Sequence, residues 1–281
     1  MWGIIGGSGF EKSESFRVIE VLDRSTPFGD ASTGLKRGQI GNEEVVFLPR
    51  HGENHEKLPS EVNYRANIYS LKRYGVDKII STSAVGSLKR EYKPGDLVVP
   101  SQYIDRTKSI RNHTFAGNGF ASHISLAKPI SKELTGLVLN LQDNFDFDLH
   151  FNGVYICIEG PYFSTQAESL SYIAMGAGII GMTGFPEYAL AREAGIHYLP
   201  CCFVTDYDCW DDSIEHVTVE IVVQTMKNNN VKAYKLIESL VNNKKASQIK
   251  SCVGKGIASG LMTQNGSIPV DSKDLISFLG K

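Results

Sequence analysis

Short apolar runs rich in β-branched residues recur along the chain, and they are nearly continuous rather than alternating. They read WGIIG, VVFLP, KIISTSA, DLVVPS, VYICIEG, GIIGMTG and IHYLPCCFVT. Runs of this kind are typical of strands that are covered on both faces, because each side of such a strand must be apolar. The pattern therefore predicts a sheet with helices packed on it.

Segments with helical periodicity and helix end signals lie between these runs. The four predicted helices cover residues 60–74, 164–176, 186–195 and about 217–241. Thr165 and Glu168 have capping-box spacing, and Pro186 lies near a first helical position. Strand and helix alternate without a repeat or a linker, so we predict a single α/β domain over residues 1–281, with a central mixed β-sheet flanked by helices. Residues 105–128 lack periodicity and are expected to form a long excursion from the sheet.

Charge and cysteine usage narrow the class of protein. The formal net charge is −2 and the pI is near 6.4, so we expect neither nucleic acid nor a membrane surface as a partner. Five cysteines without a C-x-x-C pair argue against a disulfide framework or a zinc ribbon. The chain starts without a signal-like segment and has no membrane-length apolar run, so we expect a cytoplasmic protein with reduced thiols.

The opening GIIGGSGF places glycines after a short strand, as a dinucleotide fingerprint does. That fingerprint would require glycine where Lys12 stands, so it fails. What is left is a glycine-rich turn whose N–H groups and Ser8 hydroxyl could hold an anion. The alternative is a tight turn that needs glycine only for its backbone conformation.

Polar groups follow three further predicted strands. Arg50 and His51 come after VVFLP, and an arginine offers a planar fork for two phosphate oxygens. Ser83 and the backbone at Ala84 lie at the end of a second strand, and Thr183 lies at the end of a third. Each feature alone is compatible with a solvated loop. Together they predict a site for inorganic phosphate, and no spacing of His, Cys or Asp indicates a metal.

Seven motifs in order resemble the purine nucleoside phosphorylase superfamily, and within it the trimeric methylthioadenosine phosphorylase type. They are GIIGGSGF, RHG with NHEKLPSEVNYRANI, SAVGSL, PGDLVVPSQYIDRT, IEGPYFSTQAES, GMTGFPE and TDYDCW. The resemblance covers nearly the whole chain, although the stretch after Ser247 carries little of it. It implies a phosphorylase-like fold, phosphate as co-substrate without a metal or organic cofactor, and a homotrimer with sites near subunit interfaces.

The resemblance also implies roles for individual residues. The phosphate site would consist of Ser8, Arg50, His51, Ser83, Ala84 and Thr183. Met182 would lie under the ribose, Phe163 would stack near the base, and Asp206 and Asp208 would face the purine edge. One departure from many relatives is Gly181, where they have Asn, and this could loosen the ribose or base contacts.

The chemistry of Asp206 favours adenine over a 6-oxopurine. A protonated carboxyl donates to N7 and accepts from the N6 amino group, whereas a 6-oxo group would face it as a second acceptor. Relatives that act on 6-oxopurines carry Asn at this position and Glu after Phe163, where this chain has Ser164. The same proton would relieve the negative charge on the leaving base, so Asp206 is the expected general acid. Loop caps are the alternative role for these aspartates.

The 5′ end of the ribose is the second expected point of selection. Val219 and Val223 form an i, i+4 pair in the last predicted helix, which is also compatible with a core-facing stripe. By resemblance, Val219 replaces a residue that binds a 5′-hydroxyl, and an apolar residue suits a methylthio group. His123 is the candidate contribution from a neighbouring subunit.

The sequence therefore predicts phosphate-dependent cleavage of 5′-methylthioadenosine to adenine and 5-methylthioribose 1-phosphate. Two alternatives stay open at this stage. One is a purine nucleoside phosphorylase of broader or inosine-type specificity, and the other is a nucleotide-binding protein without chemistry.

Overall fold

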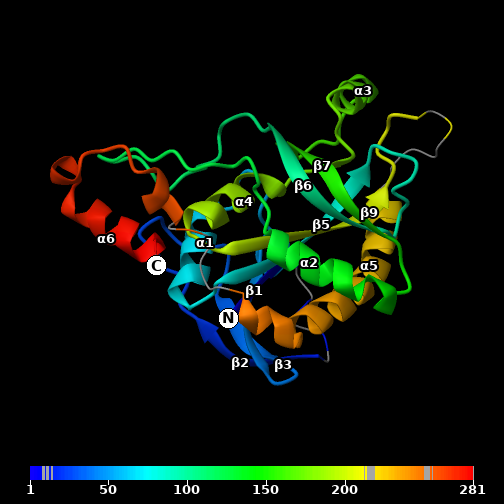
Figure 1. Ribbon diagram of the computed structural model, residues 1–281. Coiled ribbons are helices and arrows are strands. Elements are labelled where there is room, and N and C mark those ends of the chain that lie inside the picture. The colour runs from blue at the N-terminus through cyan, green and yellow to red at the C-terminus, as the bar shows by residue number, and fades with distance from the viewer. Residues whose placement is uncertain are drawn as a thin grey trace.

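Figure 1 shows the chain as a computed structural model, which describes residues 1–7, 10, 13, 15–211, 213, 219–249, 254 and 256–280, without the side chains of 219–222. The strands are β1 Trp2–Gly6, β2 Phe16–Leu22, β3 Leu35–Ile40, β4 Glu43–Pro49, β5 Lys78–Ser87, β6 Leu97–Arg106, β7 Leu149–Ile158, β8 Ile179–Gly181 and β9 His197–Asp206. The α-helices are α1 Tyr64–Arg73, α2 Lys132–Leu141, α3 Gln166–Ala174, α4 Gly184–Glu193, α5 Val219–Val241 and α6 Val270–Leu279. Short 3₁₀ turns cover Gln142–Asn144, Lys244–Gln248, Gly256–Gly260 and Asn265–Ser267.

The strands form one mixed sheet, as predicted, in the order β2-β3-β4-β1-β5-β8-β7-β6-β9. The pairs β1–β4, β1–β5 and β5–β9 are parallel. The pairs β2–β3, β3–β4, β5–β8 and β6–β9 are antiparallel. Strand β9 also pairs with β5, so β5, β8, β7, β6 and β9 close into a ring. This closure brings the ends of β5, β8 and β9 together.

Helices cover both faces of the sheet, because successive strand residues point to opposite sides. On one side Ile5 and Leu48 pack with apolar residues of α1, α4 and α6. On the other side Ile4 and Phe47 pack with apolar residues of α2 and α5. The continuous apolar runs therefore reflect burial on both faces. Helix α3 stands apart from these layers, near the β6 and β7 end of the molecule (Figure 1).

The predicted strands and helices are confirmed, with shifted ends. The first helix begins at Tyr64 rather than at residue 60, because the Asn63 side chain accepts a hydrogen bond from the Ala66 N–H and caps it. Helix α3 has the predicted capping box of Thr165 and Glu168. The hairpin β2–β3 and the helices α2 and α6 were not predicted. Residues 107–131 form the expected excursion without strand or α-helix, and no described helix is long and apolar enough to span a bilayer.

Candidate functional site

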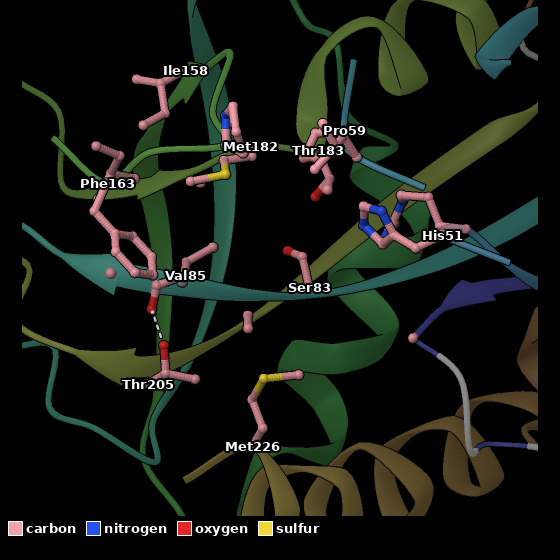
Figure 2. A pocket seen from close by; sticks show the side chains of 18 of the residues that line it. His51, Pro59, Ser83, Val85, Ile158, Phe163, Met182, Thr183, Thr205 and Met226 are labelled. Carbon is pink, nitrogen blue, oxygen red and sulfur yellow. Dashed lines mark hydrogen bonds between the residues drawn. The ribbon is translucent and has the colours of Figure 1, made fainter. Parts of the chain in front are cut away.

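A cavity of about 410 Å³ lies where β5, β8 and β9 end, which is a volume suited to a small organic ligand. Ten of the residues predicted from the sequence line it: Arg50, His51, Ser83, Ala84, Phe163, Ser164, Met182, Thr183, Asp206 and Asp208. In Figure 2, His51, Ser83 and Thr183 surround one end of the cavity, while Phe163 and Met182 lie toward the other. The sequence motifs thus converge on one place from distant parts of the chain.

The Arg50 guanidinium is buried and held on three sides. Its Nε and Nη2 donate to the Glu187 carboxylate at 2.7 and 3.0 Å, Nη2 also donates to Ser81 Oγ at 2.7 Å, and Nη1 donates to the Thr82 carbonyl at 3.1 Å. Burial opposes the charged form, but the Glu187 carboxylate raises the pKa of Arg50. The expectation that the planar fork is free for phosphate is wrong, because Glu187 on α4 occupies it. One Nη1 hydrogen is left for the cavity.

His51 is buried beside Arg50 and is held in one orientation. Its Nδ1 lies 2.9 Å from the Lys57 carbonyl, and its ring lies against His55 with centroids 4.5 Å apart. Burial and the charge of Arg50 lower the pKa of His51 to about 4. The imidazole is therefore neutral at neutral pH.

Ser83 and Thr183 lie at opposite walls of the same end of the cavity (Figure 2). The Thr183 N–H donates to the buried Tyr155 hydroxyl at 3.5 Å. A Cβ on Gly181 would come within 2.1 Å of that hydroxyl, so Tyr155 fills the space that a side chain at position 181 would need. Tyr155 of β7 thus fills the volume beside Gly181, and the loosening of ribose or base contacts stays a prediction.

Asp206 ends β9 at the other end of the cavity. One carboxylate oxygen accepts from the Asp208 N–H at 2.8 Å, and the other lies 2.6 Å from Thr205 Oγ1. Burial raises the pKa of the Asp206 carboxyl, although both hydrogen bonds act in the opposite direction. The Thr205 hydroxyl also lies 3.2 Å from the Val85 carbonyl (Figure 2). Since a carbonyl only accepts, this hydroxyl can donate to Val85 and accept a hydrogen bond from a protonated Asp206 carboxyl.

Asp208 follows in a left-handed conformation with φ of 55°. Its carboxylate accepts a hydrogen bond from the Ser169 hydroxyl of α3, and burial raises its pKa. Gly86 pairs with Asp206 across β5 and β9, and a Cβ there would lie 3.0 Å from the Asp206 carboxylate. The missing side chain of Gly86 therefore leaves room for the two acids.

Four residues predicted from the sequence are not among the described residues that line the cavity. Ser8 lies outside the described residues, and so does the side chain of Val219. Val223 is 45% exposed and does not line the cavity, because Met226, three residues later on α5, takes that wall instead. His123 lies on the excursion, where its N–H donates to the Gly260 carbonyl, and it is not part of this chain's own cavity. Within the described ranges, no cluster of side chains has the composition of a metal site.

Arg111 supports the site and was not found from the sequence. It is buried on the excursion, pairs with Glu159 at 2.6 Å, and donates to the carbonyls of Met182 at 2.8 Å and Phe185 at 2.6 Å. It therefore fixes the backbone that carries Met182 and Thr183. The polar sequence around Arg111 gave no sign that its side chain is buried. Glu187 could be seen in the sequence only as an acid within an apolar helix, which did not indicate its pairing with Arg50.

The chain is similar to known phosphorylases in sequence and in fold. Residues 2–242 match the family model described as the phosphorylase superfamily. The chain is 43% identical to the S-methyl-5′-thioadenosine phosphorylase of Thermosynechococcus vestitus, over 99% of this chain and 96% of that protein. A crystal structure of a methylthioadenosine phosphorylase from an Antarctic soil metagenomic library superposes with a TM-score of 0.92 at 40% identity, over 99% of this chain and 98% of that one. The Schistosoma mansoni methylthioadenosine phosphorylase in complex with adenine gives 0.81 at 37% identity, over 85% and 90% of the two chains.

Proposed function

We infer that this chain, which belongs to the phosphorylase superfamily, is a pentosyltransferase that cleaves 5′-methylthioadenosine with inorganic phosphate. The products are adenine and 5-methylthioribose 1-phosphate. The observation that carries this proposal is the pairing of two ends in one cavity: anion-binding groups at His51, Ser83 and Thr183, and a buried acid at Asp206.

The proposed reaction divides the work between these two ends. Phosphate, held by the Arg50 Nη1 hydrogen, the Ser83 hydroxyl and Thr183, attacks C1′ of the ribose from below the ring. The C1′–N9 bond breaks through a state with positive charge on the sugar, and the bonding electrons move onto the purine. Asp206 donates its proton to N7 and so neutralises the leaving base. The phosphate dianion offsets the charge on the sugar.

Specificity would come from the two ends of the nucleoside. A protonated Asp206 matches the N7 acceptor and the N6 amino group of adenine, and a mismatch with a 6-oxo group would cost about 1–3 kcal/mol. At the 5′ end, Met226 supplies an apolar wall that suits a methylthio group. Val219 is proposed to contribute there as well. Methionine and purine salvage are the pathways that such products would enter.

The test is a substrate panel with and without phosphate. We expect adenine to appear from methylthioadenosine only when phosphate is present, with adenosine cleaved more slowly and inosine least. Equal release without phosphate would indicate a hydrolase, dominant inosine cleavage would indicate the inosine-type enzyme, and no release would favour a nucleotide-binding protein.

Exposed apolar side chains and free cysteine thiols support the proposed assembly and location. Apolar side chains are exposed at Phe163, which lines the cavity, at the adjacent Tyr162, and at Leu170 and Met175 of α3 and its end, which suits an interface between copies of this chain. A homotrimer with sites near these interfaces is proposed, with His123 reaching a neighbour's site. The thiols of the described cysteines are free, which suits a cytoplasmic location.

A further inference from the structure

His51 lines the cavity, and one of its two ring nitrogens is already engaged by the backbone. Nδ1 faces the Lys57 carbonyl at 2.9 Å, and that carbonyl can only accept a hydrogen bond. Nδ1 must therefore carry the proton. In the described part of the chain no hydrogen bond is made by Nε2, while His51 lines the cavity beside Ser83 and Thr183 (Figure 2).

A neutral imidazole with its proton on Nδ1 has an unprotonated Nε2, which is an acceptor. A second proton is disfavoured, because Arg50 and His55 lie next to the ring and the side chain is buried. His51 therefore differs from Ser83 and from Arg50, which can both donate to an oxyanion. An oxyanion that meets Nε2 must bring its own proton.

We propose that His51 accepts the hydrogen bond of the P–OH group and so selects hydrogen phosphate over tetrahedral anions that carry no proton. The proposal rests on the proposed phosphorylase activity and adds a selectivity to its phosphate site. Sulfate and monofluorophosphate have a similar shape and charge at neutral pH, yet neither can donate. Either one would place an oxygen or fluorine lone pair against the Nε2 lone pair.

Among the described residues that line the cavity, Glu56 carries a further group that, when ionised, only accepts. Its carboxylate is exposed to solvent and accepts from the Asn54 N–H at 2.9 Å. Lys57 also lines the cavity, and its charge attracts every anion alike. Among the described lining residues, the Ser83 and Thr183 hydroxyls can either donate or accept, whereas the buried His51 Nε2 can only accept and so distinguishes a protonated anion from an unprotonated one in a water-poor setting.

The test compares anions in competition with phosphate. Sulfate and monofluorophosphate should inhibit with inhibition constants at least about tenfold above the KM for phosphate, because acceptor would face acceptor. Arsenate, which carries a proton, should replace phosphate. In His51→Gln the amide N–H₂ can occupy the place of Nε2 and donate, so sulfate should bind more tightly and phosphate less tightly.

Two controls separate the outcomes. Ser83→Ala should weaken both anions and leave their ratio unchanged, and Glu56→Gln should also leave it unchanged. The ¹⁵N NMR signals of His51 in the phosphate complex should show a proton on Nδ1 and none on Nε2. A proton on Nε2, equal affinity of the wild type for sulfate and phosphate, or a change of ratio in Glu56→Gln instead of His51→Gln would overturn the proposal. If no adenine is released with phosphate, the proposed function fails, and calorimetric binding of phosphate and sulfate still decides this selectivity.

Discussion

In the proposed mechanism, Asp206 has to keep a proton that a carboxylic acid in water loses well below neutral pH. Burial favours the neutral acid and raises its pKa from the ordinary value of 3.8. The Thr205 hydroxyl, which can donate to the Val85 carbonyl, offers that proton an acceptor before substrate binds. Burial and the neighbouring Thr205 hydroxyl therefore suit Asp206 to the proposed role of acid.

Replacing Asp206 by Asn should lower the turnover of methylthioadenosine by at least about tenfold, because the amide can donate a hydrogen bond but cannot transfer a proton. In the wild type the rate should fall as pH rises through the raised pKa of Asp206, since only the protonated acid is active. The variant should lack this decline. Rates measured from acid to alkaline pH test both points, with Asp143→Asn as the size-matched control, because Asp143 is exposed and does not line the cavity. Unchanged turnover would remove Asp206 from the mechanism.

At the scale of elements, the turn after β8 depends on a fit between two strands. Tyr155 of β7 is buried, and its hydroxyl occupies the volume beside Gly181 of β8 while it accepts from the Thr183 N–H. Interiors are packed too closely for a new methyl group to be absorbed without movement. The strand pair therefore sets the position of Met182 and Thr183.

Gly181→Ala should lower kcat/KM for phosphate and destabilise the fold by about 1–3 kcal/mol, because the new Cβ would meet the Tyr155 hydroxyl. Tyr155→Phe in the same chain should restore part of the loss by removing that oxygen. Gly136→Ala on α2 is the matched control, since a Cβ there meets nothing within 4 Å. Thermal unfolding and phosphate titrations measure both effects. If Gly181→Ala behaves like the control, the fit is not as tight as described.

Whether an element could be predicted depends on how its burial shows in the pattern of apolar residues. Central strands were predicted because burial on both faces makes them continuously apolar. The edge strand β2 was missed, because five of its seven residues are exposed and it shows no such run. In the site, strand ends with small polar residues were predicted, but the partner of Arg50 was not. Glu187 lies 137 residues away in the sequence, and only the fold brings the two together.

At the scale of the whole molecule, exposed apolar side chains at Phe163 and on α3 suit the proposed interface between subunits. Leu170 of α3 is 50% exposed, and Phe163, which lines the cavity, is 56% exposed. A covering subunit would bury both and would exclude water from the site. Assembly and activity would then be linked.

The wild type should have a mass in solution of three times the 30.9 kDa of one chain. Leu170→Glu should shift it toward smaller species and reduce kcat/KM, because a charge would be buried at the interface. Leu139→Glu on α2 is the control, since Leu139 is 48% exposed but lies away from the cavity. Light scattering after size-exclusion chromatography checks both variants. A wild type that measures as one chain would contradict the assembly.

Strand β5 lines both ends of the cavity, with Ser83 and Ala84 at one end and Val85 and Gly86 at the other. Three residues of strand span about 10 Å, so the separation of the two ends is a property of the backbone and not of any side chain. Side-chain substitutions can therefore change which nucleobase or 5′ group is accepted. An insertion or deletion in β5, by contrast, would change the spacing between the proposed nucleophile and the proposed acid. In the proposed mechanism, this fixed spacing keeps the bond-breaking step the same when the side chains around the nucleoside change.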